Sequence, residues 1–292
     1  MPELPEVETI VRGLRENLIG RQIRGVRVRT SKLLRSPLAS FRKRLTGAII
    51  KKIERKGKFI LIGLEDGATL AVHLKMTGQL LLLPEGRPTD KHTHLIFNLH
   101  PRDLQLRYRD VRKFGILVLL PSGQDWPPLA TLAPDPFELT AQGFYERLQK
   151  KKRAIKPLLL DQRFMSGLGN IYVDESLFRS RIHPLTPSQA LTWDQARGLH
   201  QRIRQVLRQA IKAKGTTVSD YRGPEGIVGG FQHYLRVYDR QGLPCCTCRN
   251  PIRKTRVGGR GTHLCPTCQT MPLKVSKSLI ENNFNFFVIM SH

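Results

Sequence analysis

Pro2 and Glu3 follow the initiator methionine, and both could take part in covalent chemistry. Removal of Met1, which is usual before a small residue, would leave Pro2 with a free secondary amine. A free α-amino group has a pKa of about 8, so a useful fraction of it is uncharged at neutral pH. Such an amine is a nucleophile that can form an iminium adduct with an aldehyde-like sugar carbon. Glu3 stands beside it as a candidate acid and base.

The residues that follow predict a helix that would hold this pair in place. Pro5-Glu6-Val7-Glu8 reads as a helix start. Apolar residues then recur with a helical period at Val7, Ile10, Val11, Leu14 and Leu18. The positive end of this helix would lower the pKa of the amine slightly further. Taken alone, the pair is better explained as an ordinary N-terminus that opens an amphipathic helix, and only the rest of the chain favours the nucleophile.

All five cysteines lie between residues 245 and 268. Cys245 and Cys248 form one C-x2-C pair, Cys265 and Cys268 form a second, and residues 249–264 separate them. This spacing predicts a tetrahedral zinc site in which two tight turns supply paired thiolates. Four thiolates leave no open position for water, so the zinc ion would be structural. Cys246 breaks the pattern; it could compete with Cys245, and we treat it as a free thiol.

The charge balance indicates a polyanionic partner. Lys and Arg number 49 against 23 Asp and Glu, which gives a formal charge of +26. Such an excess usually serves binding to nucleic acid. An anionic membrane surface and ribosomal RNA are the competing partners. No apolar run approaches the roughly 20 residues of a membrane span. Glu3, Glu6 and Glu8 stand where a signal peptide would be basic and apolar, so we expect a cytoplasmic protein.

The pattern along the chain predicts an α+β protein with two main domains. Short apolar runs at 23–28, 59–64, 69–74, 80–83, 95–99, 104–108 and 116–120 predict an antiparallel β-sandwich or barrel. Beyond a proline-rich stretch the period becomes helical, most clearly over 189–213. We expect a catalytic helix and β-sandwich domain at 1–120, a linker at 121–137, a helical domain at 138–231, a four-cysteine finger at 232–270 and a tail at 271–292.

Two features of the helical half suit phosphate binding. Gly167-Leu168-Gly169-Asn170 makes a glycine-rich turn into a helix, where backbone amides can approach an anion. The basic run 150–156 leads into another helix, although such runs are commonly solvated faces. Between the cysteine pairs, Gly258-Gly259-Arg260-Gly261 would turn a β-hairpin.

Ordered motifs carry a resemblance to a known family. They are MPELPEVET at 1–9, RKGK at 55–58, HLKMTG at 73–78, DVRKFG at 110–115, GLGNIYVDES at 167–176 and the four-cysteine site. With these motifs the chain resembles the bacterial formamidopyrimidine-DNA glycosylases, which excise oxidised purines such as 8-oxoguanine. The resemblance runs from residue 1 to about residue 270.

The resemblance implies a role for each matching residue. Pro2 becomes the nucleophile and Glu3 the acid and base, while Lys58 and Arg260 contact flanking phosphates and support proton transfer. Met76, Arg112 and Phe114 become the wedge that enters the duplex as the base leaves, with Arg112 on the orphaned cytosine. Read without the family, Met76 and Phe114 would be core residues. The remaining DNA-binding positions are His92, Lys151, Lys156 and Asn170.

The resemblance also implies the reaction and the architecture. We expect a bifunctional DNA glycosylase and AP lyase that forms a Schiff base and completes β- and δ-elimination. A helix-two turns-helix element and a zinc hairpin would form the C-terminal part. The partner is double-stranded DNA carrying an oxidised base, bound by a monomer at the bacterial nucleoid. Lys75 and Val111 replace a frequent Gly and Pro of the family, and 218–230 matches the family's mobile loop least well.

Two other functions stay open from the sequence. The first is an endonuclease VIII-type glycosylase for oxidised pyrimidines, against which Leu4 and the Arg112/Phe114 wedge argue. The second is a catalytically silent damage-binding module, favoured if Met1 is retained because an acylated proline nitrogen is not nucleophilic. The tail at 271–292 has no counterpart in the family, and we expect it to be dispensable and poorly ordered.

Overall fold

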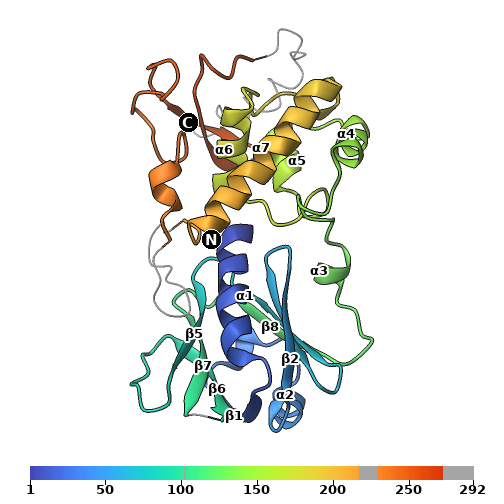
Figure 1. The fold of residues 1–292 in the computed structure, drawn as a ribbon, viewed down its shortest axis with the longest axis vertical. Coiled ribbons are helices and arrows are strands. Elements are labelled where there is room, and N and C mark those ends of the chain that lie inside the picture. The colour runs from blue at the N-terminus through green and yellow to red at the C-terminus, as the bar shows by residue number, and fades with distance from the viewer. Residues whose placement is uncertain (102, 217–228, 272–292) are drawn as a thin grey trace, which may run out of the picture. The chain divides into compact units, whose positions relative to one another are not determined.

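The structure of the protein is a computed structural model, and it describes residues 1–101, 103–216 and 229–271 (Figure 1). These residues form two compact units, one of Met1–Leu132 with Gln209–His233 and one of Ala133–Arg208 with the described residues from Tyr234 onward. The predicted loop at 218–230 and tail at 271–292 lie almost wholly outside the described residues. The predicted domain boundaries stay predictions.

The first unit is built from one long helix and two antiparallel sheets. Helix α1 spans Leu4–Leu18, close to the predicted start and end. One sheet has the order β1-β6-β7-β5 and the other β2-β3-β4-β8. The strands are β1 Gln22–Val28, β2 Ile50–Lys56, β3 Phe59–Leu64, β4 Thr69–His73, β5 Gly78–Pro84, β6 Thr93–His100, β7 Leu104–Asp110 and β8 Ile116–Leu120. Each predicted apolar run coincides with one of these strands, with Leu74 alone lying one residue beyond β4, so the predicted β-sandwich is confirmed.

The core of the first unit joins α1 to both sheets. Val7, Ile10, Val11, Leu14 and Leu18 are all fully buried and belong to one apolar cluster with residues of both sheets. The helical period therefore places one continuous face of α1 in the core. In Figure 1 the helix runs beside strands of the two sheets. Packing along this face fixes the first turn of α1, and with it Pro2 and Glu3.

Two elements of the first unit were not predicted. Strand β2 pairs with β3 at the edge of its sheet, and only Ile50 and Ile53 of β2 are buried. Its other positions are charged or exposed, as expected for an edge strand that must not pair further. Helix α2 (Leu38–Leu45) buries only Phe41 and Leu45, which is too few positions for a clear period.

The second unit is mainly helical and ends in a β-hairpin. Its helices are α4 Ala141–Gln149, α5 Ile155–Leu160, α6 Asn170–Arg179 and the first part of α7 Trp193–Lys212, and its strands are β9 Arg253–Val257 and β10 Arg260–Leu264. Short helical turns η1 Ser31–Leu33, α3 Pro127–Ala130, η2 Ser188–Ala190 and η3 Phe231–Tyr234 complete the chain. The α+β class with a helical second half is confirmed. Across the described ranges, none of the helices has the length and apolar character needed to cross a bilayer.

Candidate active site and metal centre

Pro2 and Glu3 lie at the first turn of α1, and both are buried. The Glu3 backbone N–H donates to Glu6 Oε2 at 2.8 Å, within a capping box that the two residues share. Glu6 Oε1 accepts from the Thr216 backbone N–H at 2.7 Å. One carboxylate thus ties the backbone beside Pro2 to Thr216, the last residue that the structure describes before residue 217. The arrangement gives the proline a rigid, enclosed position.

Lys58 and His73 are two enclosed basic side chains of the first unit. Lys58 occupies the two-residue turn between β2 and β3, where Gly57 has a φ of 57°, and it is only 6% exposed. Burial lowers the pKa of His73 to about 3, helped by the charges of Lys75 and Lys58. His73 Nδ1 accepts the Lys75 backbone N–H at 3.0 Å, so the neutral ring carries its proton on Nε2. The result is two nitrogen donors in one enclosed region.

The three predicted wedge residues are side chains that the structure leaves exposed. Met76 is 43% exposed and Phe114 is 52% exposed. The Arg112 guanidinium lies 4.6 Å from the centre of the Phe114 ring. Exposed apolar groups beside a cation are typical of a binding surface rather than of a core. Lys75, which precedes Met76, has a φ of 53°, a left-handed conformation that suits the glycine frequent in the family.

Asp110 joins the two loops that carry these wedge residues. This fully buried carboxylate accepts from Thr77 Oγ1 at 2.5 Å on the Met76 loop. It also accepts the backbone N–H groups of Arg112 at 3.2 Å and Gly115 at 2.8 Å on the other loop. Space is tight here, since a Cβ on Gly115 would lie 1.5 Å from the Tyr108 hydroxyl oxygen. Asp110 therefore fixes the two loops that carry the predicted wedge residues.

Asp110→Asn should impair the wedge while leaving the amine intact. The asparagine amide has one acceptor oxygen in place of two, so it cannot accept from Thr77, Arg112 and Gly115 together. The loops therefore lose charge-assisted hydrogen bonds. We expect single-turnover base excision to fall about 10- to 100-fold. Trapping of DNA that already carries an abasic site should fall much less, because no base has to leave the stack. Asp103→Asn, which changes an exposed carboxylate one residue before the same strand, is the matched control. Equal losses in both assays would contradict the positioning role.

In the second unit, Lys156 and Asn170 both hold the hairpin. Lys156 is fully buried, and its ammonium donates to Asp174 Oδ1 at 2.6 Å and to the Gly261 carbonyl at 2.9 Å. Asn170 Nδ2 donates to the same carbonyl at 2.9 Å. Asp174 Oδ2 accepts the His263 backbone N–H at 2.9 Å. These bonds fix β10 to α5 and α6. The two side chains expected on phosphates thus point into the protein, whereas Lys151 is exposed.

Replacing Lys156 should therefore lower the stability of the fold rather than remove a phosphate contact to DNA. Lys156→Met leaves the Asp174 carboxylate buried without its cation, which should lower the free energy of unfolding by about 3–5 kcal/mol. Lys151→Ala should leave stability unchanged and reduce the salt dependence of DNA binding by about one phosphate contact. Denaturant unfolding and binding titrations over a salt series measure both. A Lys156→Met protein of wild-type stability with a reduced salt slope would instead support the phosphate contact predicted for Lys156.

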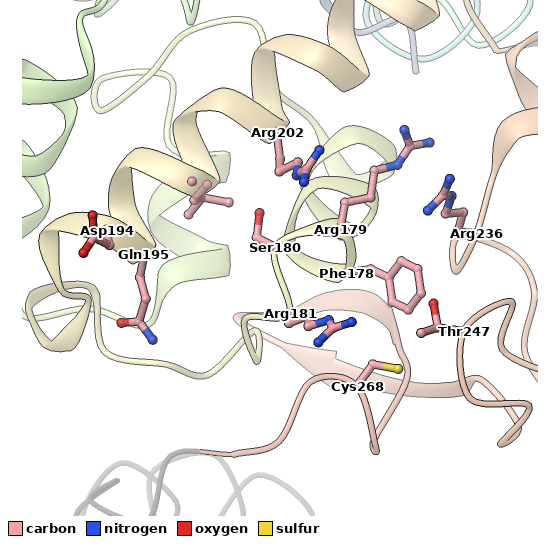
Figure 2. A pocket seen from close by; sticks show the side chains of 12 residues that line it. Phe178, Arg179, Ser180, Arg181, Asp194, Gln195, Arg202, Arg236, Thr247 and Cys268 are labelled. Atoms are coloured by element: carbon pink, nitrogen blue, oxygen red, sulfur yellow. The ribbon is translucent and has the colours of Figure 1, made fainter.

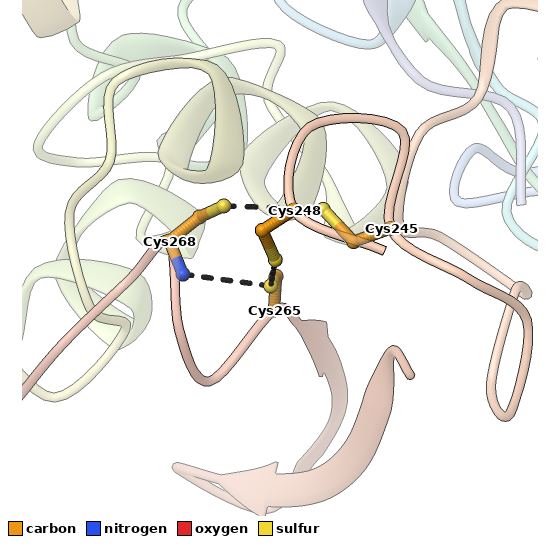
Figure 3. Close-up of side chains that lie close together, drawn as sticks. All are labelled: Cys245, Cys248, Cys265 and Cys268. Carbon is orange, nitrogen blue, oxygen red and sulfur yellow. Dashed lines mark hydrogen bonds between the residues drawn. The ribbon is translucent and has the colours of Figure 1, made fainter. Parts of the chain in front are cut away.

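The four predicted ligands come together in one metal centre (Figure 3). The sulfurs of Cys245, Cys248, Cys265 and Cys268 all lie within 4.8 Å of one another, with 3.4 Å between Cys248 and Cys265 and 3.9 Å between Cys245 and Cys268. A tetrahedral zinc with Zn–S bonds of about 2.3 Å needs sulfurs about 3.8 Å apart. The donor set fits one zinc ion, as predicted. Cys246 is exposed and outside the cluster.

The hairpin that the metal centre supports presents Arg260. Gly258 and Gly259 form its two-residue turn with φ values of 55° and 74°, so glycine suits both places. A Cβ on Gly258 would lie 2.7 Å from Pro157 Cγ, which shows how closely the turn approaches α5. Arg260 follows the turn as the first residue of β10, and its side chain is exposed. It is available to a ligand.

Several residues of these sites carried no role in the sequence analysis. Asp110 and Thr77 lie within recognised motifs, and the DVRKFG and HLKMTG patterns are the signal that could have marked them. Asp174 likewise lies in GLGNIYVDES. His92, expected at the DNA, is partly exposed, and its carbonyl accepts the Asp110 backbone N–H at 2.9 Å.

Comparison with known proteins identifies three family segments. The formamidopyrimidine-DNA glycosylase N-terminal domain matches residues 1–117, the H2TH domain of the same glycosylases matches 132–222, and the zinc finger found in FPG and IleRS matches 242–270. A formamidopyrimidine-DNA glycosylase of Bacillus cereus is 45% identical over 275 residues, which is 92% of this chain and 99% of the relative. A formamidopyrimidine-DNA glycosylase of Latilactobacillus sakei is 44% identical over 273 residues, which is 92% of this chain and 98% of the relative.

Solved structures give the same result for the fold. A Lactococcus lactis FPG variant in complex with DNA containing Fapy-dG superposes with a TM-score of 0.87 at 37% identity, covering 92% of this chain and all of the other. The wild-type Lactococcus lactis protein in complex with DNA containing an oxidised pyrimidine superposes with a TM-score of 0.86 at the same identity and coverage.

Proposed function

This chain belongs to the formamidopyrimidine-DNA glycosylase family, and we propose that Pro2 is its nucleophile and Glu3 its acid and base. As a family member it is a DNA glycosylase and AP lyase of DNA repair. Its metal is one structural zinc held by four cysteines. The zinc stabilises the hairpin and takes no part in the chemistry, because four thiolates fill its coordination sphere.

The proposed reaction starts when the amine of Pro2 attacks C1′ of the damaged nucleotide. A bond forms between the proline nitrogen and C1′, the bond from C1′ to the base breaks, and the base leaves with a proton. Opening of the sugar ring gives an iminium, whose positive nitrogen acidifies C2′. Loss of a C2′ proton expels the 3′ phosphate, and a second elimination expels the 5′ phosphate. Glu3 donates and removes protons at these steps.

The observation that most supports this proposal is the buried first turn of α1. Glu6 holds the Glu3 backbone N–H at 2.8 Å, so the residue that follows Pro2 is fixed. A nucleophile with a fixed position loses little entropy when it attacks. Burial also keeps bulk water from the iminium. The capping box alone is common at helix starts, but the second bond of Glu6, to the Thr216 backbone N–H, ties this turn to a distant segment of the chain.

DNA binding in this proposal divides between two kinds of contact. Met76, Phe114 and Arg112 fill the space that the departing base leaves, and Asp110 holds them in place. Phosphates bind to Lys151, to Arg260 and to backbone N–H groups at the start of α6, where a helix N-terminus favours anions. The side chain of Asn170 acts indirectly, by holding β10. His92 adds a partly exposed basic group in the first unit, and the enclosed Lys58 supports proton transfer.

Oxidised purines are the proposed preferred lesions. The Lactococcus lactis relatives were solved with a Fapy purine and also with an oxidised pyrimidine, so both classes must be compared. The test is borohydride trapping on matched duplexes that carry 8-oxoguanine or an oxidised thymine. We expect trapping of both and faster trapping of 8-oxoguanine. Faster trapping of the thymine lesion would favour the endonuclease VIII-type function, and binding without any trapping would favour the silent module.

The same proposal places the protein at the DNA of the bacterial nucleoid, acting as a monomer. One chain contains the nucleophile, the wedge and the zinc hairpin, so the reaction needs no residue from a second copy.

A further inference from the structure

A pocket of about 450 Å³ lies in the second unit, at the C-terminal end of α6 (Figure 2). Its lining includes Arg179, whose guanidinium donates to the Tyr234 carbonyl at 3.2 Å and lies 3.8 Å from the buried Glu175 carboxylate. Groups of the protein thus already partner this charge, and the pocket does not by itself indicate a ligand. The first unit contains a buried arginine of another kind, Arg107.

Residues 85–92, which we call the crossover, run over one face of the sheet that contains β7. Both β5 and β6 pair antiparallel with β7, which lies between them, so β5 and β6 are parallel (Figure 1). Strand β5 ends at Pro84 opposite Leu104, and β6 begins at Thr93 opposite Arg109. A connection between parallel strands has to return along the sheet. The crossover therefore runs back along β7, from the start of that strand to its end.

Arg107 lies beneath the crossover. Its neighbours in β7, Leu106 and Tyr108, belong to the buried core cluster, so the alternation of a strand directs Arg107 to the opposite face of the sheet. Arg107 is nevertheless only 2% exposed. An arginine on the outer face of a sheet is buried to this extent only when another segment covers it, and its hydrogen bonds identify that segment as the crossover.

The guanidinium of Arg107 holds the first half of the crossover. Its Nη1 donates to the Pro88 carbonyl at 3.0 Å, and its Nη2 donates to the carbonyls of Arg87 at 2.6 Å and Glu85 at 3.4 Å. Its Nε donates to Gln105 Oε1 at 2.8 Å. A segment that lies on a sheet without pairing as a strand needs donors for the carbonyls that it turns inward. Arginine supplies several such donors in a fixed geometry.

The Asp90 carboxylate holds the second half of the crossover. Its Oδ2 accepts from Arg109 Nε at 2.6 Å, and its Oδ1 accepts from the His92 backbone N–H at 3.1 Å and from Thr93 Oγ1 at 2.8 Å. Arg29 Nη1 donates to the Asp90 carbonyl at 3.3 Å. The crossover is thus bound to the sheet in both halves, which fixes the main chain of its last residue, His92.

The crossover ends beside the loop that carries Arg112 and Phe114. The His92 carbonyl accepts the Asp110 backbone N–H at 2.9 Å, and the Asp110 carboxylate accepts the Arg112 backbone N–H at 3.2 Å. Lys91 is exposed and His92 is partly exposed. Two basic residues therefore lie at the same end of β7 as the exposed wedge residues, where they can contact the backbone of DNA that the wedge enters.

We propose that Arg107 is a positioning residue for DNA binding, which holds the crossover on the sheet so that Lys91 and His92 contact a backbone phosphate next to the wedge. This inference rests on the proposed glycosylase function. An apolar side chain could cover the same face without burying a charge, but it would leave the crossover carbonyls without donors. A loosened crossover would have to be ordered again when DNA binds, at a cost in conformational entropy.

The test is titration of the zinc-loaded full-length protein with a duplex that carries a tetrahydrofuran abasic analogue, which binds without reacting, over a series of salt concentrations. Arg107→Lys keeps the charge and loses the planar fork. We expect affinity to fall about ten-fold and the salt dependence to fall by about one phosphate contact. Arg27→Lys is the matched control and should change neither quantity. Arg27 is an exposed arginine on the same face, in the row in which Ile96 of β6 pairs with both Arg27 and Arg107.

A double-mutant cycle separates positioning from a general loss of structure. In a protein that already carries Lys91→Ala and His92→Ala, Arg107→Lys should weaken binding by no more than about two-fold further, because the contacts that it positions are absent. Asp90→Ala gives a second route if Arg107→Lys folds poorly, since Asp90 is exposed and its carboxylate holds the His92 backbone N–H. It should weaken binding in the wild-type background and not in the altered one.

The proposal is overturned if Arg107→Lys and Asp90→Ala leave affinity unchanged, or if they weaken binding equally in the two backgrounds. Borohydride trapping by the unaltered protein on 8-oxoguanine DNA tests the glycosylase function separately. Absence of trapping together with the expected cycle would remove that function and leave the positioning role of Arg107 in DNA binding.

Discussion

Borohydride added during turnover should leave one covalent DNA adduct on the peptide that begins at Pro2. Reduction converts the iminium to a stable amine, so the adduct marks the attacking nitrogen. Digestion and mass spectrometry locate the adduct and also show whether Met1 has been removed. An adduct on Lys58 or any other lysine would overturn the assignment of the nucleophile even if excision were confirmed.

Three altered forms sharpen this result. A protein that retains Met1 should lose trapping entirely, because the nitrogen of Pro2 is then an amide without an available lone pair. Pro2→Gly keeps an amine at the same place, so some trapping should survive. Glu3→Gln should still bind lesion DNA but should excise about 10²- to 10⁴-fold more slowly, since it keeps the shape and loses proton transfer.

The control for Glu3→Gln is Glu16→Gln. Glu16 is exposed near the other end of α1, so the same change of charge on the same helix should leave excision unchanged. All of these proteins should bind DNA with the same steep salt dependence, because Lys151 and Arg260 contact phosphates regardless of the amine. A Glu3→Gln protein that excises at the wild-type rate would remove Glu3 from the mechanism.

Sequence patterns predicted those elements of the fold that depend on residues close together in the chain. The apolar face of α1 follows from its period, and the zinc centre follows from the spacing of two cysteine pairs, because each depends on residues close in sequence. Strand β2 was missed because an edge strand buries only Ile50 and Ile53. A pattern with so few apolar positions cannot be told from a loop.

The roles of Lys156 and Asp110 depended on contacts between distant segments. Lys156 follows a basic run and looks like a surface cation, but Asp174 and the Gly261 carbonyl, 18 and 105 positions further along the chain, enclose its ammonium. Asp110 gathers donors from two loops, one of them 33 positions earlier in the sequence. The residue types alone do not indicate which of these distant segments come into contact. Buried polar networks of this kind become visible only when the fold brings their members together.

Cys248→Ser should release zinc and unfold the hairpin that carries Arg260. Metal binding and folding are coupled in such sites, with apparent binding free energies of about 10–16 kcal/mol, so loss of one thiolate removes most of the force that holds the finger. The core of the first unit, including the face of α1 beneath Pro2, shares no residue with the metal centre and should stay folded. Affinity for lesion DNA should fall strongly, because Arg260 is displaced.

Cys246→Ser is the matched control for the metal centre, since Cys246 is an exposed thiol two residues away from Cys248. It should keep about one zinc per chain and wild-type affinity for DNA. Zinc content measured by elemental analysis and DNA titration of the same samples check both variants. If Cys246→Ser lost its zinc while Cys245→Ser kept it, Cys246 would be the ligand. The 3.9 Å separation between the sulfurs of Cys245 and Cys268 argues against that outcome, because it is close to the spacing of about 3.8 Å that a tetrahedral zinc imposes.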